Sequence, residues 1–189
     1  LGDLFRRRAW VNPNQVAVVD LAAEQEFTYD QVNSRINALA HALAARGVGK
    51  GDRVALLTFN SIEFVDSFYA IAKLGAVAVT LNWRLVADEL SFILKDSSAS
   101  ILIYGTEFAE IAADLQGRGS DGSDITSWIE VGPADKRQIF AENYDGLIAE
   151  GDTSEPELAA FDDDLMFIMY TSGTTGLPKG VMHSHNTVT

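Results

Sequence analysis

One segment near the C-terminal end strongly constrains the fold of this chain. Residues Tyr170 to Val181 read Y-T-S-G-T-T-G-L-P-K-G-V, which combines glycines, hydroxyl groups and one lysine. The segment follows Leu165–Met169, a continuous apolar run typical of a buried strand. Glycines let backbone N–H groups surround phosphate oxygens and adopt the positive φ angles of tight turns. Hydroxyl groups add donors and Mg²⁺ ligands, and Lys179 adds a mobile positive charge. The sequence therefore predicts a strand that ends in a nucleotide-phosphate loop.

The Walker A loop, G-x-x-x-x-G-K-S/T, does not fit this segment. Counting from Gly173, Pro178 stands where the second glycine is required, and Gly180 follows Lys179 where serine or threonine is required. Pro178 also removes a backbone donor at the point where the Walker helix would begin. The segment therefore indicates a different class of phosphate loop.

The segment matches, residue by residue, the T/S-S-G-T-T-G-x-P-K-G-V loop of the adenylate-forming superfamily. That superfamily contains acyl-CoA synthetases, peptide-synthetase adenylation domains and luciferases. From Phe27-Thr28-Tyr29 through the loop, the chain resembles the N-terminal part of an acyl-CoA synthetase. Two details favour the CoA ligase branch. Residues Leu81–Leu85 read L-N-W-R-L, as in acyl- and aryl-CoA synthetases, and the loop has Thr174 where peptide-synthetase domains often have serine.

The resemblance implies a two-step reaction that uses ATP, Mg²⁺ and, as co-substrate, CoA. A fatty or aryl carboxylate attacks the α-phosphate of ATP and releases pyrophosphate, and a thiol then attacks the acyl-adenylate. It implies that Lys179 and Thr175 act in catalysis, that Thr171 is a Mg²⁺ ligand, and that His185 belongs to the substrate pocket. The implied nucleotide-binding residues are Thr171, Ser172, Gly173, Thr174, Thr175, Gly176 and Lys179.

Several motifs of the superfamily do not occur in this sequence. They are the adenine-binding stretch, the Y-G-x-T-E motif, the ribose-binding aspartate, the hinge and the catalytic lysine of the C-terminal domain. We therefore expect residues 1–189 to be a partial N-terminal AMP-binding domain, with its phosphate loop at 170–181, that does not turn over alone. Two alternatives stay open: a peptide-synthetase-type or acyl-carrier-protein ligase, and a nucleotide-binding module without chemistry.

Strand-like and helix-like segments alternate along the chain with short connections. This pattern predicts an α/β fold with a mainly parallel layered sheet flanked by helices. The helix that opens at the capping box of Thr28 and Gln31 should end at Gly47. The other expected helices cover residues 60–73, 87–95 and 107–115. The expected strands cover residues 16–19, 26–28, 53–58, 76–80, 100–104, 128–131, 165–169 and 180–183.

Three further segments have local interpretations. Residues Gly47–Asp52 resemble a dinucleotide loop, but they precede a strand, so a helix C-cap followed by a tight turn is favoured. Arg84 and Asp88 have the spacing of an i, i+4 ion pair. Residues 150–164 are rich in acidic side chains and have no basic one, which predicts a solvated linker into the Leu165 strand.

Composition excludes several classes of function. A formal net charge of −13 disfavours nucleic acid as a partner, because its phosphate backbone would be repelled. The absence of cysteine excludes disulfides and thiolate chemistry. No apolar run reaches the ~20 residues that span a bilayer. A soluble, cytoplasmic protein is expected, and a homodimer is compatible with the sequence.

Overall fold

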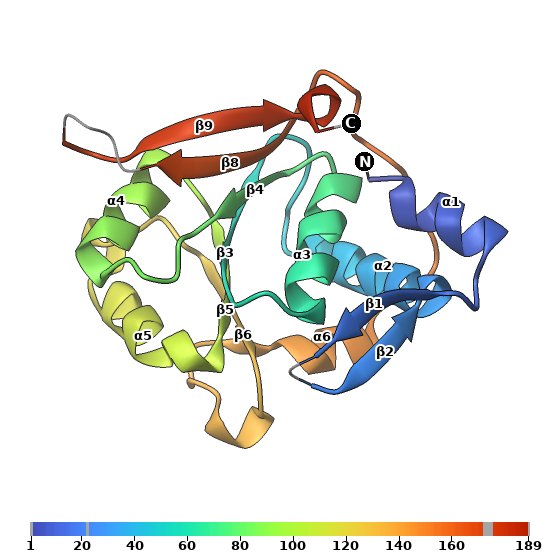
Figure 1. Cartoon of the computed structure of the whole chain (residues 1–189). Coiled ribbons are helices and arrows are strands. Elements are labelled where there is room, and N and C mark those ends of the chain that lie inside the picture. The colour runs from blue at the N-terminus through green and yellow to red at the C-terminus, as the bar shows by residue number, and fades with distance from the viewer. Residues whose placement is uncertain (1, 22, 172–175, 189) are drawn as a thin grey trace.

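The computed structural model describes residues 2–21, 23–171 and 176–188 (Figure 1). Its α-helices are α1 (Leu4–Val11), α2 (Tyr29–Ala45), α3 (Ile62–Lys73), α4 (Ala87–Asp96), α5 (Ala109–Gly117) and α6 (Tyr144–Glu150). Its strands are β1 (Val16–Asp20), β2 (Gln25–Thr28), β3 (Arg53–Leu57), β4 (Val77–Thr80), β5 (Ile101–Gly105), β6 (Ser127–Val131), β7 (Glu142–Asn143), β8 (Leu165–Thr171) and β9 (Lys179–Ser184).

The main sheet has seven strands in the order β7-β6-β5-β3-β4-β8-β9. All neighbouring strands run parallel except β8 and β9, which form an antiparallel hairpin. Strands β1 and β2 form a separate antiparallel pair. The predicted mainly parallel α/β sheet is thus confirmed.

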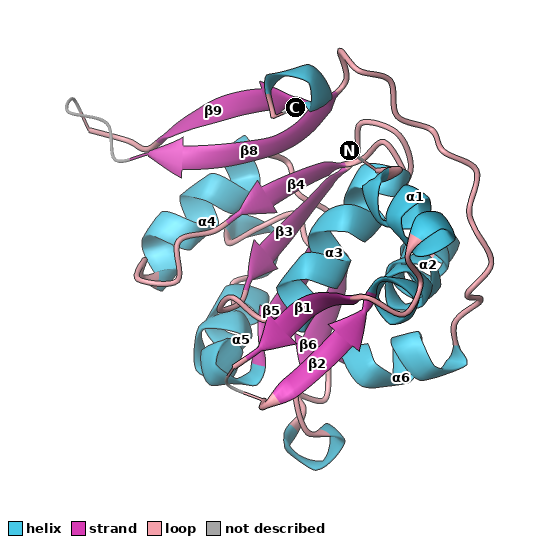
Figure 2. Ribbon diagram, turned by 45° about the vertical axis from the view of Figure 1, so that its right-hand side comes forward, coloured by secondary structure: helices cyan, strands magenta, loops and turns pink. Residues whose placement is uncertain are grey.

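Helices cover both faces of the parallel strands (Figures 1 and 2). Helices α2, α3 and α6 pack on one face, where Val54 and Leu56 of β3 enter the core. Helices α4 and α5 pack on the other face, where Ala55 and Leu57 of the same strand enter the core. Successive residues of a strand point to opposite faces, and both faces of β3 are buried, so its residues 54–57 are all apolar.

Helix α2 forms as its sequence predicts. Thr28 Oγ1 accepts a hydrogen bond from Gln31 N at 3.3 Å, and Gln31 Oε1 accepts one from Thr28 N at 2.8 Å, so the capping box is complete. Gly47 follows the helix with φ of 84°, a left-handed conformation that favours glycine. One face of the helix forms an apolar stripe that is fully buried in the core, with Val32, Ile36, Leu39, Ala40 and Leu43.

Two local predictions are wrong. Helix α3 begins after Ser61, whose hydroxyl caps it by accepting from Phe64 N, so Asn60 lies before the helix. Arg84 does not pair with Asp88, because Asp88 Oδ1 accepts from Arg118 Nη1 at 2.6 Å. The Arg84 guanidinium instead lies 4.0 Å from the centre of the Trp83 ring.

Strand β8 is less buried than its apolar sequence predicts. Among its residues only Met166 is fully buried, and Leu165 and Met169 are exposed. Strand β8 has β4 on one side and β9 on the other, and β9 lies at the sheet edge with mainly exposed residues. The hairpin projects along one margin of the molecule, where fewer helices cover it (Figure 1).

Residues 151–164, which we call the strap, connect α6 to β8. The strap runs along the outer side of the helices (Figure 2), and most of its residues are exposed, as its acidic composition predicts, but one of its carboxylates binds a buried group. Glu155 pairs with Lys73, whose side chain is fully buried. Lys73 Nζ also donates to Asn37 Oδ1 at 2.6 Å and to Asn33 Oδ1 at 3.0 Å. The strap is therefore bound to α2 and α3 through a buried ammonium group.

The described residues contain no helix that is both long and apolar enough to span a bilayer.

Candidate nucleotide-binding site

The predicted phosphate loop starts and ends on the β8–β9 hairpin. Thr171 is the last residue of β8 and Lys179 the first of β9, and the two are cross-strand partners. Directly opposed residues in an antiparallel pair place their side chains next to each other on one face. Both residues are exposed. A hydroxyl and an ammonium group therefore stand together at the base of the loop.

Gly176 gives the returning half of the loop a conformation that other residues rarely adopt. Its φ is 128°, in the region that favours glycine. A Cβ atom at this position would meet no heavy atom of the described residues within 4 Å. Glycine is therefore required by the backbone angle rather than by crowding. The other predicted loop residues, Ser172, Gly173, Thr174 and Thr175, lie outside the described residues.

Two other loops leave the same edge of the sheet, since the carboxyl ends of parallel strands share one edge. Phe59 follows β3, and its ring packs on Trp83 at 5.1 Å and on Phe108 at 5.2 Å between centroids. Phe59 and Trp83 remain 45% and 41% exposed. Together with Arg84, these rings form an aromatic surface that carries a positive charge on the edge where β8 ends.

A metal ion would find few protein ligands here. The described residues contain no group of three or more His, Cys, Asp or Glu side chains that could hold one. Thr171 supplies one hydroxyl oxygen. Because Mg²⁺ prefers oxygen ligands and keeps several from phosphates and water, this fits an ion that arrives with a nucleotide.

His185 lies at the opposite end of β9 from Lys179. It begins a 3₁₀ turn, His185–Thr187, that follows Ser184. Its side chain is buried, and burial lowers the pKa of the imidazole. It lines a cavity of about 210 Å³. The cavity is bounded by Gly2, Asp3, Arg7, Leu158, Ala160, Phe161, Asp162 and His185. Its role in a substrate pocket stays a prediction.

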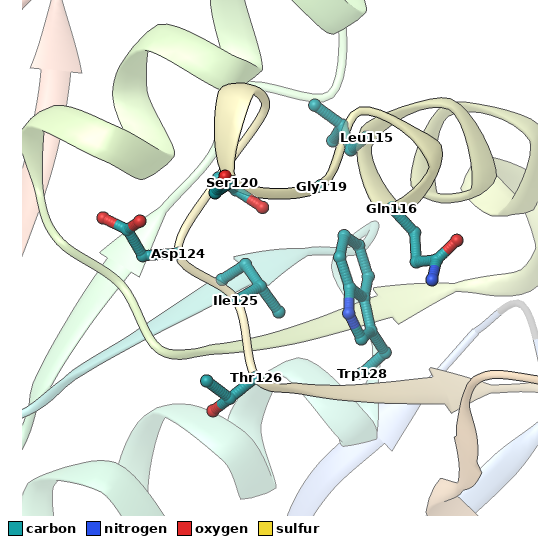
Figure 3. Close-up of a pocket in the computed structure, with 9 residues that line it drawn as sticks. Leu115, Gln116, Gly119, Ser120, Asp124, Ile125, Thr126 and Trp128 are labelled. Carbon is teal, nitrogen blue, oxygen red and sulfur yellow. The ribbon is translucent and has the colours of Figure 1, made fainter.

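A larger pocket, of about 500 Å³, lies away from the phosphate loop (Figure 3). Its walls come from the end of α5, the loop after it and the start of β6, with Trp128 on one side. The pocket therefore lies at the amino end of β6, whereas the phosphate loop follows the carboxyl end of β8. None of the described residues of the phosphate loop lines this pocket.

Two residues at the base of the loop have contacts that the sequence alone does not reveal. Tyr170 Oη donates to Asp96 Oδ2 on α4 at 2.6 Å. Gly180, the cross-strand partner of Tyr170, lies under its ring. Both belong to the loop motif, yet the motif gives no sign of the partner on α4, which is 74 positions away in the sequence.

Comparison with known proteins decides the family. A family model described as AMP-binding enzyme matches residues 5–189. The chain belongs to the AMP-binding enzyme family. The phosphate-loop motif and the mainly parallel sheet agree with this assignment.

Curated members of the AMP-binding enzyme family resemble the chain over all or most of its length. Long-chain-fatty-acid–CoA ligase FadD13 of Mycobacterium tuberculosis is 43% identical over 188 residues, which cover 100% of this chain and 35% of the relative. The 3-hydroxybenzoate–CoA/4-hydroxybenzoate–CoA ligase of Thauera aromatica is 36% identical over 89% of this chain and 31% of its own length. The chain thus spans about a third of the length of these relatives.

The solved structure of a CoA ligase has the same fold as this chain. The anthranilate CoA ligase AuaEII, in complex with anthranoyl-AMP, matches with a TM-score of 0.89 and 33% sequence identity. The match covers 97% of this chain and 34% of the ligase. The arrangement of strands and helices described above is therefore that of an AMP-binding enzyme.

Proposed function

We propose that this chain is the N-terminal part of an AMP-forming acid–thiol ligase, an acyl-CoA synthetase. In this proposal residues 1–189 are part of a larger AMP-binding domain, and the complete protein activates a fatty or aryl carboxylic acid with ATP and transfers it to CoA. Both co-substrates are metabolites of the cytoplasm, which is the compartment we propose.

The observation that carries the proposal is the paired position of Thr171 and Lys179 at the base of a family phosphate loop. The names of the relatives support the reaction class, since FadD13 is a fatty-acid–CoA ligase and the Thauera protein a hydroxybenzoate–CoA ligase. The complex of AuaEII with anthranoyl-AMP supports an acyl-adenylate intermediate. The relatives act on both aliphatic and aromatic acids, so the acid class is left to experiment.

The chemistry of adenylation explains the residue types. Substitution at the α-phosphate spreads negative charge over the phosphate oxygens and the leaving pyrophosphate, and positioned cations and donors stabilise it. Lys179 would neutralise negative charge on the β- and γ-phosphates of ATP. The Thr175 hydroxyl would donate a hydrogen bond to the same phosphates. The loop residues Ser172, Gly173, Thr174 and Gly176 would enclose the phosphates. Thr171 would be the protein ligand of a Mg²⁺ ion, which supplies further charge neutralisation when bound.

The test is product identification with the complete protein. Purified enzyme is incubated with ATP, Mg²⁺, CoA and, one at a time, a panel of fatty and aryl acids. We expect AMP and an acyl-CoA thioester with at least one acid. Release of ADP, or transfer only to a carrier-protein phosphopantetheine thiol, would contradict the assignment to CoA ligases.

Gly176→Val should weaken nucleotide binding by the complete protein while the fold is kept. A β-branched residue is strained at φ of 128°, so the returning half of the loop would have to move. Calorimetric titration with ATP measures the effect, and we expect affinity to fall at least about tenfold, an expectation that corresponds to ~1.4 kcal/mol.

A matched control for this variant is Gly51→Val. Gly51 also has a positive φ, of 83°, and open space at its Cβ position, but it lies in the turn before β3. It should lose stability without losing ATP affinity. Equal losses of ATP affinity in both variants would show that the loop conformation of Gly176 is incidental.

A further inference from the structure

Few residues of the hairpin that carries the phosphate loop are buried, so side-chain packing holds this hairpin only weakly. In β8 only Met166 is fully buried, and the residues of β9 are mostly exposed. Near its start, β8 is held on the α3 side, where the ring of Phe167 packs against Phe68 at 5.6 Å and against His183 at 4.5 Å. The loop end of the hairpin, which carries Thr171 and Lys179, needs an anchor of its own.

Tyr170 provides that anchor on the other face of the sheet. Its ring packs against the core cluster that includes Leu90, Ile93 and Leu94 of α4. Its hydroxyl donates to Asp96 Oδ2, at the end of α4, at 2.6 Å. Partial burial and the Asp96 carboxylate raise the pKa of Tyr170, so the phenol keeps the proton that it donates.

The same ring also fixes the returning strand. A Cβ atom at position 180 would lie 3.1 Å from Tyr170 Cζ and 2.9 Å from Ile168 Cγ2. Only glycine lets the ring lie this close to the β9 backbone. Tyr170 therefore contacts α4 through its hydroxyl and β9 through its ring, one residue from the pair of Thr171 and Lys179.

We infer that Tyr170, held by Asp96 and packed on Gly180, is a positioning residue for Thr171 and Lys179 at the base of the phosphate loop. This inference rests on the proposed function. The Tyr170–Asp96 hydrogen bond ties the loop end of the hairpin to α4 and keeps Thr171 and Lys179 in the register that presents both groups to the phosphates. The role goes beyond fold stability, because the residues that it places are those that would contact ATP.

Steady-state kinetics of the complete enzyme test this inference, with ATP and the carboxylic acid varied separately. Tyr170→Phe removes the hydroxyl and keeps the ring. We expect the KM for ATP to rise about fivefold to tenfold, which lies within the range typical of losing one ordinary hydrogen bond, while the KM for the acid changes less than about twofold. Gly180→Ala should raise the KM for ATP as well, because its methyl group displaces the same ring.

Tyr104→Phe is the matched control. Tyr104 Oη donates to the carboxylate of Glu130 at 2.8 Å inside the core, so this variant loses the same kind of bond away from the hairpin. It should lower the thermal midpoint without changing the KM for ATP. Equal rises in KM for ATP with Tyr104→Phe and Tyr170→Phe would overturn the inference, because the effect would then follow stability alone.

A double-mutant cycle supplies the second readout. If Tyr170 acts through Asp96, the pair Tyr170→Phe with Asp96→Ala should raise the KM for ATP no more than the stronger single variant. Additive effects, or an unchanged KM for ATP in Tyr170→Phe, would overturn the inference while leaving the proposed function in place. A wild-type enzyme that activates no acid would instead contradict the proposed function, and this inference with it.

Discussion

Lys179→Ala in the complete enzyme is expected to slow acid activation at limiting ATP by tenfold or more, which corresponds to ~1.4 kcal/mol or above. Lys179 is exposed at the base of the loop beside Thr171, and no ion pair among the described residues involves it. Its charge is therefore available to the β- and γ-phosphates. Initial rates of AMP release at ATP concentrations below the KM measure the effect.

The control for this variant is Lys136→Ala. Lys136 is an exposed lysine in the segment between β6 and β7, and its loss changes the net charge by the same amount. We expect its rate to equal that of the wild type. An unchanged rate in Lys179→Ala would mean that the loop is not the phosphate site.

Glu155→Ala should lower the free energy of unfolding by about 3 kcal/mol, the loss typical of leaving one partner of a buried ion pair uncompensated. The Lys73 side chain is 0% exposed, and Glu155 is the acidic partner of its ammonium group. Asn33 and Asn37 can accept hydrogen bonds from Nζ but cannot neutralise its charge. Denaturant unfolding of the complete protein measures this loss of free energy, with a signal that reports on residues 1–189.

Two further variants distinguish the effect of losing the Glu155–Lys73 ion pair from the effect of changing any residue of the strap. Glu157→Ala changes a neighbouring exposed glutamate of the strap and should leave stability within about 0.5 kcal/mol of the wild type. Lys73→Met in the Glu155→Ala background removes the stranded charge and should recover part of the loss. If Glu155→Ala were as stable as Glu157→Ala, the binding of the strap to α2 and α3 would not depend on the Glu155–Lys73 ion pair.

Local signals in the sequence were sufficient for much of the fold. The capping box of Thr28, the left-handed glycine at 47 and the apolar stripe of α2 depend on residues a few positions apart. Strands β3 and β5 are buried on both faces, so a continuous apolar run identifies them. Short elements were not predicted, because α1, α6 and the two-residue β7 are too brief or too polar to give a periodic pattern.

The features that sequence reasoning missed depend on long-range partners. Lys73 and Glu155 are 82 positions apart, and Tyr170 and Asp96 are 74 apart. An acidic run is normally solvated, so its composition cannot reveal that one carboxylate neutralises a buried lysine. The exposure of β8 likewise depends on its place beside the edge strand, which an apolar run does not specify. At the candidate site, the motif predicts the residues, and the structure adds the pairing of Thr171 with Lys179.

The most direct test of the central claim is ATP–pyrophosphate exchange by the complete wild-type enzyme, with no thiol present. Adenylation is reversible, so labelled pyrophosphate should enter ATP only when a suitable carboxylic acid is supplied. We expect acid-dependent exchange with at least one fatty or aryl acid, and its loss in Lys179→Ala. Tight ATP binding without exchange for any acid in the panel would contradict the account, since the chain would then belong to a nucleotide-binding module rather than to a ligase.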